Sequence, residues 1–455
     1  MILASPHTIL GDINSGRDVK NYKLGEPFEF NFNYSGQITF KNVVFEKHVY
    51  IRSFKSHDNI YFHNCTFEGA FIVDNQTNLA NLGLVDCQFN NDCVINHSEF
   101  LKLNLTSSFF KNGIQSNLLR IHNLRIELIT SNNAKFTFFQ PFIELCHISK
   151  LRDNSDLIFT TFDTSINAFG DGFVQSLAYN ADSQYQGMLL AYGPEIQILT
   201  LNGYNKSGRL MFQDLKIANI TASQFTNAGL LSFANITAQS PYIIFLFRSN
   251  LGKCEIYDID FTRFRTIKVD NSNIQDIIPT NITWCHEVGS SLTGESKFRH
   301  MREIYRQLKN IMIRQNDKVM ELTYHRLEMD NYLRAINNLK GYNTDKFIIK
   351  TNQLSNRHGL SWTQPLIILL VSGLLVYTIN KWLLGFTHFD SNLIFKDFAL
   401  LLESLNPIRK FSSIYDESII GFRANLAFFL DVIFRLFSAY MVFQFISAFR
   451  KYAKK

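Results

Sequence analysis

NVVFEK at 42–47, NCTFEG at 64–69 and DCQFNN at 86–91 are three copies of one pattern, and they decide the fold. Their phenylalanines, Phe45, Phe67 and Phe89, lie 22 residues apart at each step. SSFFKN at 107–112 follows, with Phe110 one residue short of the next step. A fixed period of this length is typical of a solenoid, in which each repeat stacks on the one before it.

The residues between these copies alternate between apolar and polar, and the runs are separated by Asn, Asp and Gly, which is typical of short strands joined by turns. A step of 22 residues fits one coil of a parallel β-helix built from three short strands. We expect the solenoid over residues 28–290, with phenylalanines stacked inside and asparagine ladders at the corners. Residues 150–215 show no clear register and predict an insertion or lateral loop; a β-sandwich is the alternative fold.

One stretch resembles a known family. TNLANLGLVD at 77–86, with Ala80, Asn81 and Leu82, resembles the repeat unit of bacterial pentapeptide-repeat and related right-handed β-helix proteins. The resemblance is loose, because the five-residue period is lost elsewhere, and it covers about the first 290 residues. It implies a right-handed parallel β-helix but no chemistry. The DNA mimicry of some members is not carried over, because the strongly acidic surface it needs is absent.

Charge divides the chain into two parts. Residues 1–296 contain 22 Lys+Arg and 27 Asp+Glu, whereas residues 297–455 contain 23 and 12. The basic part also contains the most apolar segments, so we expect its cations to contact anionic lipid headgroups and expect no nucleic acid partner. No signal peptide is visible near the N-terminus, so we expect the first part to lie in the cytoplasm. The six cysteines lack metal-type spacing, so we expect core thiols and no cofactor.

Residues 297–342 change to helical periodicity. Apolar residues follow one face before Asn316-Asp317 and another after it, which predicts a helical hairpin broken at that pair. The hairpin is basic. The plainest interpretation is a solvated helix face, and contact with lipid headgroups is the next.

Two further segments predict membrane spans, at about 362–384 and 424–449. The first contains 19 consecutive uncharged residues from Trp362 to Asn380, and Trp362 and Trp382 bracket it as an interfacial pair. Between the spans, residues 393–408 are amphipathic and too short to cross, so they lie on the interface or re-enter between the spans. Seven cations on the terminal side against four in the loop (Lys396, Arg409, Lys410 and Arg423) place both ends in the cytoplasm.

The second span contains two opposite charges, Asp431 and Arg435, four residues apart and able to pair on one helix face. Three interpretations stay open: they line a water-filled seam between protomers, Arg435 reaches the headgroup layer, or they clamp the first span through Asn380 or Tyr377. Small residues that let helices approach closely are Ser372, Gly373, Ser438 and Ala439. The cations expected at lipid headgroups are Arg450, Lys451, Lys454 and Lys455.

Together these patterns predict a mainly β N-terminal domain at 1–296, a helical hairpin at 297–342 and a two-pass transmembrane domain at 343–455. The ending FQFISAFRKYAKK resembles the tails of bacterial membrane proteins in which a β-helix precedes two spans. We expect a multi-pass inner-membrane homo-oligomer whose β-helix binds a cytosolic partner or ligand. Its spans permeabilise or conduct, by analogy with antiphage-defence effectors. The alternatives are a scaffold anchored without a pore and, less favoured because no acidic cluster recurs at coil spacing, a polysaccharide-active β-helix enzyme.

Overall fold

The computed structural model of the 455-residue chain divides it into two compact units, residues 1–292 and 293–455. It describes residues 1–30, 36–52, 55–74, 77–127, 129, 134–149, 151, 156–163, 168–169, 172–336, 344–385, 394–415 and 421–453.

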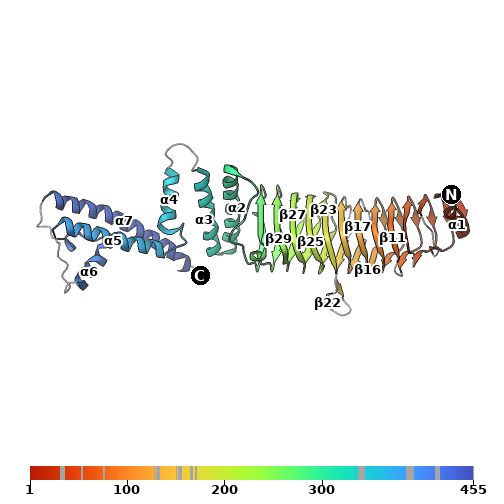
Figure 1. The fold of residues 1–455 in the computed structure, drawn as a ribbon, viewed down its shortest axis with the longest axis horizontal. Coiled ribbons are helices and arrows are strands. Elements are labelled where there is room, and N and C mark those ends of the chain that lie inside the picture. The colour runs from red at the N-terminus through yellow and green to blue at the C-terminus, as the bar shows by residue number, and fades with distance from the viewer. Residues whose placement is uncertain are drawn as a thin grey trace. The chain divides into compact units, whose positions relative to one another are not determined.

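The N-terminal unit is a parallel β-solenoid of stacked coils (Figure 1). Two sheets of twelve parallel strands run its length, and a six-stranded sheet accompanies only the first coils. The first long sheet contains β2 (Val19–Lys20), β5 (Gln37–Lys41), β8 (Lys55–His63), β11 (Asn78–Val85), β14 (Glu99–Thr106), β17 (Arg120–Glu127), β19 (Phe142–Ser149), β23 (Phe173–Ala181), β25 (Glu195–Asn205), β27 (Lys216–Asn227), β29 (Thr237–Phe247) and β31 (Thr266–Asp270).

The second long sheet contains β4 (Phe28–Phe30), β7 (Val49–Arg52), β10 (Phe71–Asp74), β13 (Cys93–Asn96), β16 (Gly113–Asn117), β18 (Lys135–Phe139), β20 (Asp156–Thr160), β24 (Met188–Tyr192), β26 (Arg209–Gln213), β28 (Leu230–Ala234), β30 (Cys254–Tyr257) and β32 (Ile278–Thr280). The short sheet contains β1 (Ile2–Ala4), β3 (Tyr22–Leu24), β6 (Val44–Phe45), β9 (Thr66–Phe67), β12 (Gln88–Phe89) and β15 (Phe109–Phe110). The helix α1 (Pro6–Asn14) begins after Ser5, whose hydroxyl caps it, and a 3₁₀ turn η1 spans Phe261–Arg263.

The parallel β-solenoid predicted from the 22-residue step is confirmed. The repeated phenylalanines form a stacked ladder in the core: ring centroids are 5.0 Å apart for Phe45 and Phe67, and 4.5 Å apart for Phe67 and Phe89. Phe110 continues the ladder at 4.5 Å from Phe89, so the short step changes a turn but not the stack.

The predicted corner ladders are also present. The side-chain amide of Asn64 donates to Asn42 at 2.8 Å, and that of Asn42 donates to Asn21 at 3.1 Å. All three residues have φ between 52° and 60°, in the left-handed region where Asn is among the best-tolerated non-glycine residues. The corner conformation therefore explains why Asn recurs at this point of the repeat.

Three expectations about the solenoid need correction. Strands begin at Ile2, ahead of the expected start at residue 28. Three strands per coil hold only as far as β15; beyond it the described coils use two, and β25, β27 and β29 lengthen to 11, 12 and 11 residues. In the segment 150–215 expected to be an insertion, β20, β23, β24 and β25 stay in the two long sheets. Among the described residues of this segment, the antiparallel pair β21 (Phe162–Asp163) and β22 (Ala168–Phe169) leaves the stack (Figure 1).

The C-terminal unit is helical. The predicted hairpin is formed by α2 (Gly294–Gln315) and α3 (Lys318–Ile336), with Asn316 in the left-handed C-cap conformation. Asp317 caps α3 by accepting a hydrogen bond from the backbone N–H of Met320 at 3.0 Å, so the predicted break is confirmed. A further helix, α4 (Thr344–Asn356), lies in the stretch that the sequence assigned to the membrane domain without structure of its own.

Two helices of this unit are long and apolar enough to cross a membrane, α5 (Thr363–Leu383) and residues 422–450 of α7 (Phe422–Ala453), as predicted. They pack in opposite directions. Trp362, before α5, contacts Phe449 near the end of α7, and Tyr377 belongs to the same packed cluster as Ala427 near its start. Between them lie α6 (Ile394–Ser404) and the 3₁₀ turn η3 (Phe411–Ser413).

Candidate functional site

The segment that connects α6 to η3 enters the space beside the two apolar helices. Leu405, the first residue after α6, belongs to the packed cluster of Leu369, Phe434 and Met441. A Cβ atom added at Gly373 would clash with the side chain of Leu405 and would lie 3.4 Å from Phe434. Gly373 is the midpoint of α5, so the segment reaches halfway along that helix. The missing side chain of Gly373 permits the close approach.

A fully buried ion pair fixes this segment to α7. The guanidinium of Arg409 contacts both carboxylate oxygens of Asp431 and is itself almost completely buried. The Nε atom of Arg435 lies 3.1 Å from the second carboxylate oxygen, so the predicted pairing of Asp431 with Arg435 is present in the structure. Asp431 therefore lies between two arginines of its own chain.

The two arginines, together with Ser438, also donate hydrogen bonds to backbone carbonyl groups. Arg409 donates from Nε to the carbonyl of Ser404 at 3.3 Å, and Arg435 donates to the carbonyl of Arg409 at 3.0 Å. The hydroxyl of Ser438 donates to the carbonyl of Leu405. The carbonyls of Leu405 and Arg409 belong to non-helical backbone between α6 and η3, whereas that of Ser404 belongs to the last residue of α6, where no following turn supplies a donor. We call Arg409, Asp431, Arg435 and Ser438 the charge cluster.

Each charged side chain of the cluster is stable in this environment because the others pair with it. An unpaired charge in an apolar interior is strongly unfavourable, and removing one member of a buried pair typically costs ~3–5 kcal/mol. Asp431 offsets the charge of one arginine, and the arginines supply donors to backbone carbonyls of the segment after α6. One positive charge is left over. Arg435 is the charged member that reaches the surface, with 22% of its side chain exposed.

The other predicted site residues are distributed differently. Ser372 donates within its own helix to the carbonyl of Ile368 at 2.6 Å, and it borders an entirely apolar surface hollow on α5 that Ile367 and Val371 also line. Ala439 and Arg450 are exposed. The side chain of Lys451, together with Lys454 and Lys455, lies outside the described residues.

Asn380 does not join Asp431, although sequence reasoning suggested that it could. Its amide is buried and lies 3.5 Å from the hydroxyl of Tyr415, which packs on Tyr377. Asp431 therefore joins α7 to the segment after α6, through Arg409, and does not join α7 to α5 through Asn380.

Sequence reasoning missed Arg409 and counted it as an exposed loop cation. The available signal was its place in LNPIRKF at 405–411, a cation inside an apolar stretch that directly follows an amphipathic helix. Of the four cations counted in the loop, the structure buries this one. Charge counting cannot separate a buried cation from an exposed one.

One further polar contact joins two helices of the C-terminal unit. The amide of Asn356, at the end of α4, donates to Gln444 of α7, and both are buried.

Among the described residues, no group of three or more His, Cys, Asp or Glu side chains forms a metal-ion site. All six cysteines are free, and five of them are buried.

Comparison of the chain with protein-family models, with curated proteins and with solved structures finds no match.

Proposed function

We propose that this protein is a membrane-anchored β-solenoid scaffold, in which α5 and α7 both cross a lipid bilayer. A helix of 21 residues is ~31 Å long, close to the ~30 Å of a bilayer's hydrocarbon core. The antiparallel packing of α5 and α7 puts the start of one beside the end of the other, as two consecutive crossings require.

The observation that carries the proposal is the pairing of the charge cluster with non-helical backbone halfway along α5. In a bilayer, backbone outside a helix is tolerated only where the protein itself satisfies its polar groups. Arg409, Arg435 and Ser438 donate to three such carbonyls, those of Lys410, Arg409 and Leu405. On this view the charges of α7 exist to hold a re-entrant segment between the crossings.

Orientation follows from the position of the cations. We propose that the solenoid and the C-terminus face the cytoplasm of a bacterial cell, with Arg450, Lys451, Lys454 and Lys455 at the lipid headgroups. The long parallel sheets then offer a binding surface for a cytosolic partner. We propose a binding role for this surface and no catalytic one.

Reconstitution tests the proposal. Purified protein is incorporated into liposomes that contain a trapped fluorescent dye, and the mixture is floated on a density gradient after washing at alkaline pH. An anchor floats with the liposomes and leaves the dye inside. Protein that stays at the bottom of the gradient refutes membrane insertion.

A second candidate function is an oligomer whose α7 helices line a conducting path, of the type used in antiphage defence. The uncompensated positive charge of the cluster favours this second candidate. Arg435 is partly exposed, and a charged side chain within a bilayer is stabilised by contact with water or a counter-ion. Dye release in the same assay supports this candidate over the simple anchor. Release that is lost in Arg435→Leu, but kept in the matched surface variant Arg423→Leu, assigns the path to Arg435.

A further inference from the structure

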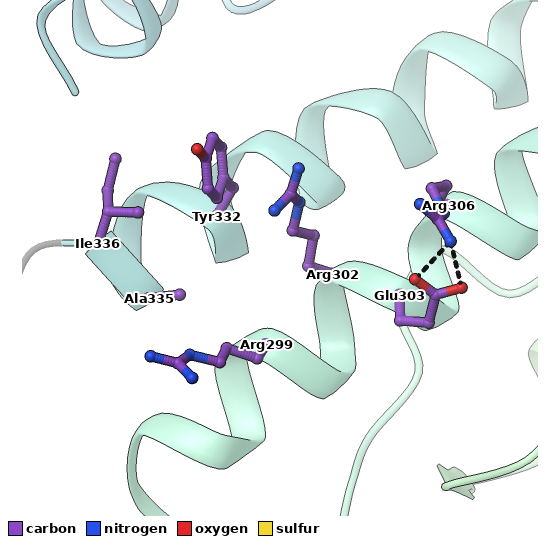
Figure 2. Close-up of a pocket in the computed structure, with 7 residues that line it drawn as sticks. All are labelled: Arg299, Arg302, Glu303, Arg306, Tyr332, Ala335 and Ile336. Atoms are coloured by element: carbon purple, nitrogen blue, oxygen red, sulfur yellow. Dashed lines mark hydrogen bonds and ion pairs between the residues drawn. The ribbon is translucent and has the colours of Figure 1, made fainter. Parts of the chain in front are cut away.

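A pocket of about 290 Å³ lies between α2 and α3, away from the charge cluster. Figure 2 shows its lining: Arg302 lies beside Tyr332, Arg299 extends on the other side of Ala335, and Arg306 turns toward Glu303. Arg299, Arg302 and Arg306 are spaced by three and four residues, which places them on one face of α2.

The pocket has an excess of positive charge. Arg306 and Glu303 form an ion pair at 2.8 Å, so each neutralises the other. Arg299 has no ion-pair or hydrogen-bond partner within the part of the chain that the structure describes. Arg302 lies over the ring of Tyr332, with 3.8 Å between the guanidinium carbon and the ring centroid, which fixes the direction of its donors. Two guanidinium groups are therefore available to an anion.

The form of the site indicates the chemical class of the anion. Planar guanidinium groups bind phosphate through paired hydrogen bonds, and two of them match the charge of about −1.5 to −2 that a phosphomonoester has at neutral pH. Buried Ala335 and Ile336 give the pocket an apolar floor, suited to a short organic group. The volume lies at the lower limit of small-molecule sites, roughly 300–1,000 Å³, so the ligand is small.

We propose that this pocket binds a phosphomonoester, with Arg299 and Arg302 as the phosphate ligands and Tyr332 holding Arg302 in place. Two sources share this chemistry: a soluble phosphorylated metabolite and the headgroup of a phosphatidic-acid lipid.

Isothermal titration of the full-length protein in a neutral detergent tests the proposal. The two probes are glycerol 3-phosphate and monomeric dihexanoyl phosphatidic acid. We expect one or both to bind, and we expect the double variant Arg299→Gln/Arg302→Gln to weaken binding at least tenfold. Binding of glycerol 3-phosphate assigns a soluble ligand, whereas binding of the lipid alone assigns a headgroup.

The matched control is Arg314→Gln, which removes an exposed arginine of the same helix twelve residues beyond Arg302. It should bind within about twofold of the unmodified protein, because distant exposed charges are largely screened. The single variant Arg299→Gln guards against misfolding, since this exposed side chain supports no described contact; it should bind several-fold more weakly with an unchanged melting temperature. Failure of both probes to bind, or equal affinity in the double variant and the control, overturns the proposal.

Discussion

Asp431 shows how one residue can organise a segment far from it in sequence. Its carboxylate holds Arg409, and Arg409 and Arg435 in turn hold the backbone of the segment after α6. Placing a charged side chain in an apolar helix is energetically unfavourable. We therefore expect such a residue where its removal would leave other buried polar groups unpaired, at a higher cost in free energy. In this protein the loss of Asp431 would leave Arg409 buried without a counter-charge.

Replacing Asp431 by Asn should destabilise the C-terminal unit strongly. The substitution keeps the shape but leaves Arg409 buried without a counter-charge, at a cost of ~3–5 kcal/mol. We expect a clear fall in the melting temperature of the purified protein in detergent, followed by intrinsic fluorescence. Arg423→Gln removes an exposed charge from the start of the same helix and should leave the melting temperature unchanged. Equal stability of the two variants would show that the charge cluster contributes nothing.

His358 gives the helical unit a dependence on pH. Burial lowers the pKa of this histidine below its ordinary 6.5; His325 and Arg326 act in the same direction and Asp330 opposes them. The unfolded chain therefore binds a proton near pH 6.5 that the folded chain resists, so the free energy of unfolding falls as the pH drops below that value. For Glu328, burial is the largest single effect and raises the pKa, but His325 and Lys309 together outweigh it and lower the pKa, which affects stability only below about pH 4.5.

We expect the melting temperature of the unit to fall between about pH 7.5 and pH 5.5 and His358→Gln to reduce that fall. The control His286→Gln changes an exposed histidine of the N-terminal unit and should leave the dependence intact. Thermal unfolding of the unmodified protein and the two variants at both pH values gives the melting temperatures to compare. A dependence that is the same in His358→Gln as in the unmodified protein assigns it to other groups.

At the scale of elements, the strands of the solenoid are defined by their stacking. Phe67 is fully buried and lies between the rings of Phe45 and Phe89. Each coil can bury its phenylalanine only because the next coil covers it, which makes the ladder the continuous core of the N-terminal unit.

Phe67→Ala should therefore open a cavity between three coils and destabilise the solenoid by ~3–5 kcal/mol. Phe245→Ala is the control, because that ring is only half-buried and stacks with Phe247 in a distant coil. Thermal unfolding followed by the β-sheet circular dichroism signal compares the two, with a larger loss expected for Phe67→Ala. The reverse order would mean that the ladder is not the core.

The elements that repeat or follow a clear period were the predictable ones. The spacing of Phe45, Phe67 and Phe89 predicted the solenoid, and Asn316-Asp317 predicted the break in the helical hairpin. The long strand β25 was not predicted, because its alternation is interrupted by a register irregularity between Leu201 and Gly203. The contact of Arg409 with Asp431 could not be predicted from sequence patterns either, because it joins residues 22 apart whose proximity depends on tertiary packing.

At the scale of the whole molecule, the chain combines two units with different sources of stability. The solenoid has a stacked aromatic core of its own, whereas less than a third of the most apolar stretch of α5 and of α7 is buried, and many of their large apolar side chains are exposed. Helices of this length would be mostly covered in the core of a water-soluble protein. Lipid is the partner that would cover them, and the change in net charge between residues 1–296 and 297–455 agrees with that assignment.

The most direct test of this account asks whether the two ends of α7 lie on opposite sides of a membrane. Single cysteines replace Phe422 and Arg450, both exposed at the ends of the helix, in a Cys285→Ser background that removes the least buried native thiol. A membrane-impermeant maleimide is added to intact bacterial cells that express the protein, and then to opened cells. The account predicts that Phe422→Cys reacts in intact cells and that Arg450→Cys reacts only after the cells are opened; reaction of both under the same condition would contradict it.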